Sequence, residues 1–305
     1  MSADADAAGA GTPGGDDAHR PVMVAEVVRF LVEQAPRHDI VVDMTVGAGG
    51  HSEALLRAGV GRVIGVDRDP DAIALAQARL DAYGDRFRTA RTTFERVDDR
   101  LVGGPVDGFL YDLGVSSMQI DRAERGFSYR TDGPLDMRMG GDADEERSAA
   151  DLVNTLPRSE LADLIFELGG ERRSRRIAEA IVRRRPITST DELAGVIVGA
   201  VGRRPGGPHP ARRTFQALRI AVNREIEELA ASLPQAVGLL APGGRVVVIA
   251  YHSLEDRVVK TTFRDDERVV ALTKKPLRPS DEEVARNPRA RAAIFRAAER
   301  VGAAA

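Results

Sequence analysis

A glycine-rich segment near the start of the chain has the spacing of a cofactor site. An apolar run over residues 40–42 leads into Asp43-Met-Thr-Val-Gly47-Ala-Gly49-Gly50-His51, and a second apolar run over residues 63–66 ends at Asp67. This order predicts a strand, a tight loop, a helix and a second strand with a carboxylate at its tip. Glycines let the backbone approach a ligand, and a carboxylate in that place accepts both hydroxyls of a ribose. We therefore predict a site for the adenosine part of a cofactor.

The glycine spacing discriminates between two cofactor classes. A dinucleotide fingerprint requires Gly-x-Gly-x-x-Gly, but Ser52 stands at the third glycine position. Asp43 precedes Gly47 by four residues, and an acid before Gly-x-Gly is expected for S-adenosylmethionine, whose sulfonium and ammonium groups favour a nearby carboxylate. This donor also lacks the pyrophosphate that needs a helix N-terminus. The motif favours a methyl donor over a nicotinamide, with a turn that only needs flexible glycines as the structural alternative.

Composition excludes several kinds of chemistry. The 305 residues are 43% hydrophobic and 30% charged, which suits one large globular domain with an insertion, or two domains. The absence of cysteine excludes disulfides, thiolate metal sites and a cysteine nucleophile. No histidine spacing suggests a metal, no apolar run reaches the roughly 18 residues that span a membrane, and residues 1–18 read as a disordered acidic tail. We expect a cytoplasmic protein without a metal.

Arginine is concentrated in one part of the chain. The formal net charge is -3, yet residues 147–213 hold 13 Arg against 8 Asp and Glu, a net of +5. The arginines form clumps at 172–176, 183–185, 203–204 and 212–213. Such clumps suit a polyanion better than a small substrate, so nucleic acid is a candidate partner, and a solvated helix face is the alternative.

Strand and helix patterns alternate at both ends of the chain but not in its middle. Further strands are predicted at residues 87–93, 106–112 and 244–251, and helices at 22–34, 70–80 and 214–233. Such alternation predicts a parallel sheet with ligands at the carboxyl ends of its strands. A polar stretch at 113–139 and several short helices from 149 to about 201 interrupt it. Two late segments, 268–273 and 290–299, are candidates to close the sheet as a hairpin-like pair.

From this alternation we predict an α/β methyltransferase-like domain over residues 19–138 and 211–305, with a helical domain inserted at 139–210. Three side chains follow predicted strand ends and are candidates for the site. Phe94 lies against an adenine face or in the core. His252 contacts an acceptor or only caps the helix that follows.

Asp112 is the third of these residues and the strongest candidate for chemistry. The exocyclic amine of a base is a poor nucleophile, because its lone pair is delocalised into the ring. A carboxylate that accepts the amine hydrogens favours the pyramidal transition state and takes the released proton. A loop-capping role is the alternative. In amino-group methyltransferases an Asp or Asn here is commonly followed by Pro-Pro and an aromatic residue, whereas this chain reads Asp112-Leu-Gly-Val-Ser-Ser117.

Several motifs, taken together and in order, resemble one family. They are His51 after the glycine loop, Asp67-Arg-Asp-Pro70, Asp112-Leu-Gly-Val-Ser-Ser117, Asp121-Arg-Ala-Glu-Arg-Gly-Phe-Ser128, Asp132-Gly-Pro-Leu-Asp-Met-Arg-Met139, Gly170-Glu-Arg172, His209-Pro-Ala-Arg-Arg-Thr-Phe-Gln-Ala217, Tyr251-His-Ser-Leu-Glu-Asp-Arg257 and Asn287-Pro-Arg-Ala-Arg291. From about His19 to Val301 the chain is similar to the bacterial 16S rRNA (cytosine-N4) methyltransferases, the RsmH or MraW family. Two departures are mild: Met118 where the family often has Pro, and Tyr251 where Phe is commoner.

The resemblance implies a class I methyltransferase fold with a small inserted helical domain. It implies that S-adenosylmethionine binds over a set of matching positions, to which the glycine motif adds Asp43 and Gly47. The matching positions are Gly49, Gly50, His51, Asp67, Phe94, Asp112 and Gln119. The implied acceptor is N4 of a cytidine in the decoding centre of 16S rRNA, within the small ribosomal subunit.

The resemblance also implies roles for side chains on the acceptor side. Asp112 would orient the amine for direct attack on the methyl group, with His252 and Asp136 as secondary candidates. RNA contact becomes the favoured role of the arginine clumps. The implied RNA contacts are Arg172, Arg173, Arg175, Arg176, Arg203, Arg204, Arg212 and Arg213. Phosphate contacts position RNA without reading its sequence, so a base flipped into the pocket must supply selectivity.

Three other functions stay open on the sequence alone. A nicotinamide-dependent oxidoreductase is disfavoured by Ser52 and Asp43. A ribosome-assembly factor that binds S-adenosylmethionine without catalysis would bind subunits and transfer no methyl group. A DNA cytosine-N4 methyltransferase is disfavoured because Pro-Pro is missing after Asp112. The oligomeric state, a homodimer included, is also open.

Overall fold

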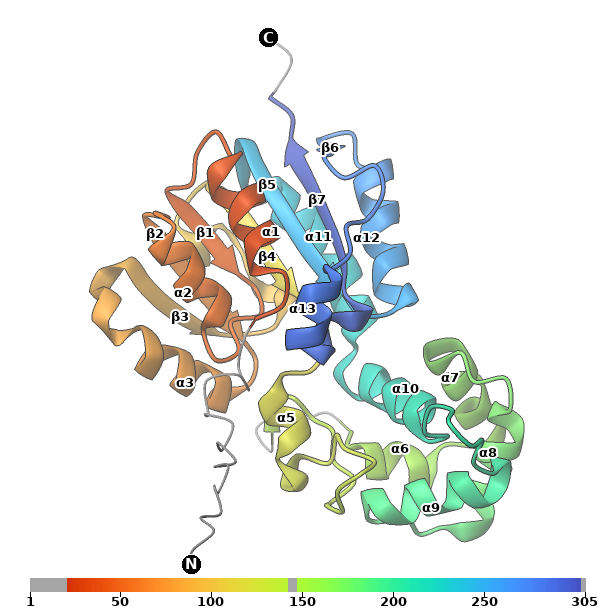
Figure 1. Ribbon diagram of the computed structural model, residues 1–305. Helices are drawn as coiled ribbons and strands as arrows, with labels where there is room; N and C mark the ends of the chain where they lie inside the picture. The colour runs from red at the N-terminus through yellow and green to blue at the C-terminus, as the bar shows by residue number, and fades with distance from the viewer. Residues whose placement is uncertain (1–20, 142–146, 303–305) are drawn as a thin grey trace, which may run out of the picture.

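The computed structural model describes residues 21–141 and 147–302, so the tail predicted at 1–18 lies outside the described residues. Its centre is a seven-stranded sheet in the order β3-β2-β1-β4-β5-β7-β6. The strands are β1 (Ile40–Asp43), β2 (Arg62–Asp67), β3 (Phe87–Arg91), β4 (Val106–Asp112), β5 (Leu240–Ala250), β6 (Val269–Ala271) and β7 (Ile294–Arg300). The first five strands pair in parallel, and β7 is antiparallel to both β5 and β6. The predicted parallel sheet and the late antiparallel pair are both confirmed (Figure 1).

Both faces of the sheet are covered, because successive side chains of each strand point to opposite sides. On β4, Phe109 and Tyr111 join one buried cluster and Leu110 joins the other. The helices beside the sheet are α1 (Val24–Val28), continued by a π-helical turn (Arg29–Glu33), α2 (Gly50–Arg57), α3 (Pro70–Leu80), α4 (Asp99–Val102), α11 (Glu225–Leu239), α12 (Ser253–Asp265) and α13 (Asp281–Arg286). Short 3-10 segments lie at Asp81–Arg86, Phe94–Arg96 and Pro288–Ala292.

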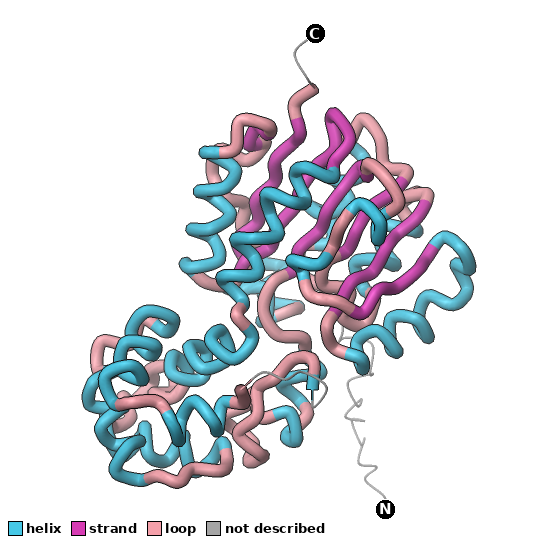
Figure 2. The backbone as a smooth tube through the Cα atoms, turned by 180° about the vertical axis from the view of Figure 1, so that it is seen from behind, coloured by secondary structure: helices cyan, strands magenta, loops and turns pink. Residues whose placement is uncertain are grey.

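A second unit is entirely helical and lies beyond the edge at which β4 ends (Figures 1 and 2). It contains α6 (Ala149–Thr155), α7 (Arg158–Gly169), α8 (Ser174–Arg184), α9 (Thr190–Val201) and α10 (Arg212–Asn223). These helices share a separate hydrophobic core, which includes Leu135 and Met137 before the predicted insertion and Phe215 and Leu218 after it. The core of this unit thus includes residues on both sides of the insertion predicted at 139–210. The bounds of that domain stay a prediction.

The stretch predicted as one helix at 214–233 is two helices with a sharp joint. Arg224 adopts a left-handed conformation with φ 49°, which ends α10 and starts α11 in a new direction. The side chain of Asn223 fixes the joint, since its amide nitrogen donates to the carbonyl oxygen of Met137 at 2.8 Å and its oxygen accepts from the backbone N–H of Met139 at 2.8 Å. The joint thus ties the helical unit to the loop that follows β4.

The polar stretch after β4 is partly helical, with α5 (Ser117–Asp121) and a 3-10 turn (Ala123–Arg125). Within the described residues, no helix combines the length and the hydrophobicity that crossing a bilayer would need.

Candidate active site

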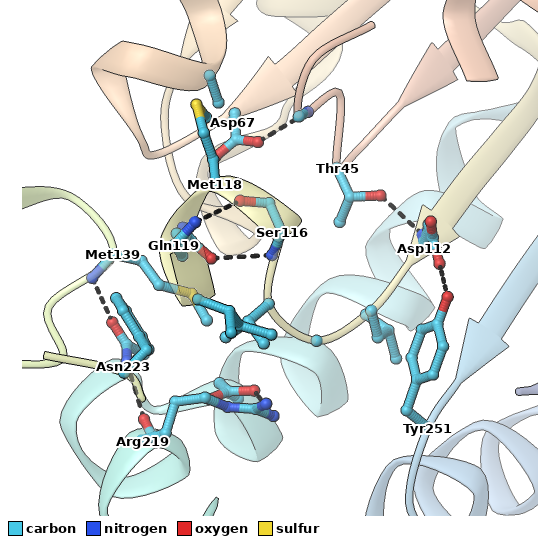
Figure 3. Close-up of a pocket in the computed structure, with 18 of the residues that line it drawn as sticks. Thr45, Asp67, Asp112, Ser116, Met118, Gln119, Met139, Arg219, Asn223 and Tyr251 are labelled. Atoms are coloured by element: carbon cyan, nitrogen blue, oxygen red, sulfur yellow. Dashed lines mark hydrogen bonds and ion pairs between the residues drawn. The ribbon is translucent and has the colours of Figure 1, made fainter. Parts of the chain in front are cut away.

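A cavity of about 590 Å³ opens between the carboxyl edge of the sheet and the helical unit. One wall comes from the segments directly after β1, β2, β4 and β5. The other comes from α10, the start of α11 and the later part of the loop after β4, at residues 127–139. Because parallel strands end at the same edge, residues distant in sequence converge there, as Figure 3 shows for Thr45, Asp67, Asp112 and Tyr251. The cavity is the candidate active site.

The glycine loop after β1 has a backbone that side chains would disturb. Gly47 and Gly49 have φ of 51° and 81°, the left-handed region that favours glycine. A Cβ added at Gly49 would lie 3.1 Å from Cδ1 of Leu80 and 3.3 Å from Cα of Ala76. The absence of a side chain at Gly49 therefore lets the loop pack closely against α3. Gly47, Gly50 and His51 line the cavity, whereas Gly49 lies outside its lining.

Asp67 stands at the tip of β2, on the cavity wall, as predicted for a residue that binds a ribose. Its carboxylate accepts the backbone N–H of Gly47 at 3.0 Å and that of Asp69 at 2.9 Å. Burial raises the pKa of Asp67 to about 6, and these two hydrogen bonds offset part of that rise. A carboxylate oxygen accepts more than one hydrogen bond, so both oxygens keep acceptor capacity for hydroxyl groups.

Asp43 does not line the cavity. It is fully buried under the glycine loop, where its carboxylate accepts the hydroxyl of Ser52 at 2.7 Å and the backbone N–H of Thr45 at 3.2 Å. Burial raises its pKa, against the opposing charge of His51 and the hydrogen bond from Ser52. These contacts hold the loop to α2, so Asp43 supports the site from beneath rather than from its surface.

Asp112 lies at the centre of the cavity wall and is held on both carboxylate oxygens. The hydroxyl of Tyr251 donates to Oδ1 at 2.7 Å, and Nε2 of His51 lies 3.3 Å from Oδ2. The backbone N–H of Asp112 donates to Oγ1 of Thr45 at 2.7 Å (Figure 3). Burial disfavours the charged form of His51, but the hydrogen bond and charge of Asp112 outweigh it and raise the His51 pKa. The structure thus brings Asp112 and His51, both predicted from the sequence, side by side on the cavity wall.

Phe94 and Gln119 also line the cavity. Phe94 meets Tyr111 edge-on, with ring centroids 5.6 Å apart, so it contributes both to the cavity and to the core. Gln119 is buried and donates from Nε2 to Oδ2 of Asp69 at 3.0 Å, while its side-chain oxygen accepts the backbone N–H of Ser116 at 3.1 Å. These bonds fix the loop after β4 against the turn after β2.

His252 caps α12, as one of the two predicted alternatives has it, and it also lines the cavity, so its contact with an acceptor stays a prediction. Its Nε2 lies 3.2 Å from a carboxylate oxygen of Glu255, and the ligand atoms of Glu225, His252 and Glu255 lie within 4.8 Å of one another. The guanidinium of Arg219 binds both oxygens of Glu225 at 2.7 Å. Since Arg219 already supplies a positive charge there, the cluster makes no case for a metal ion.

Asp136, the other secondary candidate, does not line the cavity. It forms an ion pair with Arg138 at 2.7 Å. The pKa of Asp136 is lowered, because burial, which would raise it, is outweighed by the hydrogen bonds and charge of Arg138. Asp136 therefore stabilises the loop that leads into α6.

The predicted RNA-contact arginines fall into two groups. All are exposed, but only Arg212 lines the cavity. Three make contacts that shape the helical unit: Arg173 donates to the carbonyl oxygen of Val201, Arg213 to that of Gly170, and Arg203 lies 3.0 Å from Nε2 of His209. Among the described residues no ion pair or side-chain hydrogen bond is found for the remaining members, which are Arg172, Arg175, Arg176, Arg204 and Arg212.

Sequence reasoning did not identify four further lining residues: Thr45, Tyr251, Arg219 and Asn223. Thr45 and Tyr251 follow strands directly, so their place in the chain was a usable signal. Arg219 and Asn223 reach the cavity only because α10 folds back against the sheet edge, which no local pattern encodes.

Comparison with known proteins agrees with this geometry. The model of the MraW methylase family matches residues 16–301. A relative from Mycobacterium sp. (strain KMS), named ribosomal RNA small subunit methyltransferase H, is 45% identical over 325 residues, covering 97% of this chain and 87% of the relative. One of the same name from Methylobacterium sp. (strain 4-46) is 50% identical over 312 residues, covering 93% and 91%. The family, enzyme class and fold class predicted from the sequence are confirmed: this chain belongs to the MraW methylase family.

Proposed function

We propose that this protein transfers a methyl group from S-adenosylmethionine to N4 of a cytidine in the decoding centre of 16S rRNA. The observation that carries the proposal is the position of Asp112. Its carboxylate lies at the end of β4 on the cavity wall, beside His51 of the glycine loop, and it is one-fifth exposed (22%) to the cavity. A carboxylate there can hold the hydrogens of an amine next to a bound donor.

The sheet side of the cavity fits the donor. The left-handed glycines leave the loop backbone open to a ligand, Asp67 offers acceptors to hydroxyls, and Phe94 offers an apolar ring. Asp67, Asp112 and the other acids supply negative potential for a cationic ligand. When bound, S-adenosylmethionine supplies an electrophilic methyl group. The residues of this chain then have to hold the acceptor amine, exclude water and receive a proton.

The helical side fits an RNA acceptor. Arg212 stands at the cavity, and the other guanidinium groups without a partner among the described residues lie on the same unit: just before α8, on α8 and before α10. Guanidinium groups bind phosphates, which gives affinity and orientation, whereas the cavity selects the base that enters it. The names of the relatives support rRNA of the small subunit as the substrate. We place the reaction on the small ribosomal subunit in the cytoplasm.

The proposal is tested with small subunits from a strain that lacks the enzyme. They are incubated with the purified protein and S-adenosylmethionine labelled in its methyl group, and the rRNA is digested to nucleosides for mass spectrometry. Label in N4-methylcytidine at one decoding-centre position is the expected result. Absence of label, with the donor still bound in calorimetry, would contradict the acceptor and favour a ribosome-assembly role without catalysis.

A matched DNA substrate distinguishes the proposed function from that of a DNA cytosine-N4 methyltransferase. A single-stranded DNA of the same sequence is offered under the same conditions. The proposal expects label in the subunit and none in the DNA, because the helical unit contacts a folded RNA surface. Equal labelling of both would contradict the assignment of rRNA as the substrate.

A further inference from the structure

The carboxylate of Asp112 is clamped from two directions. Tyr251 donates to Oδ1 at 2.7 Å, and His51 lies 3.3 Å from Oδ2. Because each oxygen has its own partner, rotation of the carboxylate about its last bond breaks at least one contact. Hydrogen bonds to a charged acceptor are shorter and stronger than neutral ones. The hydrogen bond from Tyr251, together with the contact to His51, therefore favours one orientation of the carboxylate.

Tyr251 is itself fixed by its surroundings. It follows β5, which pairs in parallel with β4 through Asp112 and Ile249. Its backbone N–H donates to Oε2 of Glu255 at 2.7 Å, and its ring packs on the loop at Gly114, where an added Cβ would lie 3.4 Å from the ring. The ring is half-buried and the hydroxyl points at Asp112 (Figure 3). The hydroxyl is therefore delivered by the strand next to the one that carries the carboxylate.

The hydroxyl acts as a donor throughout the working range of pH. Burial, and then the negative charge of Asp112, raise the pKa of Tyr251 well above its ordinary value, with smaller effects from Glu255 and Glu283. On the opposite side, His51 faces Asp112, Asp43 and Glu283. Tyr251 is thus a neutral donor to one oxygen of Asp112, and His51 faces the other oxygen.

We propose that Tyr251, at a position where Phe is commoner in the family, is a positioning residue for the methyl transfer in this chain and acts through Asp112. Its hydroxyl occupies one lobe of Oδ1, so that the remaining acceptor lobes of the carboxylate point into the cavity, where an amine hydrogen would arrive. The inference rests on the proposed function, since it needs an amine acceptor. Tyr251 itself takes no proton.

The test is Tyr251→Phe, which removes the hydroxyl and keeps the ring against Gly114. We expect kcat to fall about tenfold, while KM for the subunit and the Kd of S-adenosylmethionine measured by calorimetry change less than about twofold. Tyr83→Phe, at a tyrosine outside the cavity lining, is the matched control and should leave every value unchanged.

A second background separates positioning from a general effect on structure. In Asp112→Ala there is no carboxylate to orient, so adding Tyr251→Phe should leave the residual single-turnover rate unchanged. A tenfold loss in both backgrounds would overturn the inference, and so would an unchanged kcat for Tyr251→Phe alone. A wild-type protein that methylates no cytidine would overturn the proposed function and this inference with it, whereas the other two outcomes leave the proposed function intact.

Discussion

The two walls of the cavity are built in opposite ways. On the sheet wall the two carboxylates are held by several contacts each: Asp67 accepts two backbone N–H groups, and Asp112 accepts the hydroxyl of Tyr251 and lies 3.3 Å from His51. On the helical wall Arg212 is exposed, and so are Arg172 and Arg176 beyond it. Fixed acceptors suit a small ligand that must be held in one geometry, whereas exposed guanidinium groups suit a large anion that must be attracted and then aligned. The difference supports the proposed function, in which one wall binds the donor and carries the chemistry and the other captures the substrate.

The largest effect is expected from removing the carboxylate of Asp112 from the sheet wall. Asp112→Ala should lower kcat about 10³-fold, because the acceptor for the amine protons is lost, and it should also weaken donor binding. Single-turnover labelling of subunits measures the first effect and calorimetry the second. Turnover within a few-fold of wild type would show that another group receives the proton.

The sheet wall alone should respond to a change in the glycine loop. Gly49→Ala places a Cβ against Leu80 and Ala76 in a left-handed backbone, which costs about 1–2 kcal/mol, so donor affinity should fall about 5- to 30-fold. Gly103→Ala is the matched control, since its φ of 84° is similar to the 81° of Gly49 and nothing lies within 4 Å of the added Cβ. Equal donor affinity in the two variants would mean that the loop does not bind the donor. Subunit binding should be unchanged in both.

The helical wall should respond to the loss of charge. Arg172→Gln with Arg176→Gln should lower affinity for the small subunit about tenfold at low salt and reduce its salt slope by about two. Donor affinity should not change. Arg100→Gln with Lys260→Gln removes the same charge from exposed positions beside the sheet and serves as control. If both pairs weaken binding equally, net charge rather than the helical wall attracts the RNA.

The smallest effect concerns pH. The pKa of Asp67 is raised to about 6, so as pH falls from 7 to 5 the carboxylate is protonated and donor affinity should fall several-fold. The stability of the protein without donor should change in the opposite direction over the same range, because ionising a carboxylate with a raised pKa opposes folding and its protonation removes that cost. Asp67→Asn should abolish both pH dependences. Donor titrations and thermal unfolding from pH 5 to 7 measure the two effects. A wild-type Kd for the donor that is constant over this range would contradict the role of Asp67 in donor binding.

Much of the sheet could be predicted because its strands carry local signals. The fourth strand was predicted with its observed bounds, since an apolar run from Val106 ends at an acid, Asp112. The fifth was predicted from Gly244, but β5 begins at Leu240. Pro242 and the two glycines after it break the apolar pattern, and Gly243 has a φ of 80°. The pairing with β4 shifts register there, from Val106 with Leu240 to Gly108 with Arg245, and it is this pairing that extends the strand back to Leu240.

The site was predictable where residues follow strand ends, and not where tertiary packing decides. Asp67, Asp112 and His252 line the cavity as their positions suggested, whereas Asp43 and Asp136 have the right residue type and lie outside its lining. Nothing local distinguishes an acid that faces the cavity from one that supports the loop beneath it. The joint at Arg224 had no signal either, because a left-handed arginine is set by the contacts of its neighbour Asn223.

The place of β7 in the sheet affects the order in which the chain can fold. β7 is the last of the described strands in the sequence, but it lies between β5 and β6 and pairs with both. During synthesis β6 therefore emerges with no strand to join, and β5 keeps an unpaired edge until residues 294–300 appear. An unpaired edge invites pairing with other chains. The new chain should therefore be most prone to aggregation and degradation in the interval before residues 294–300 are synthesised.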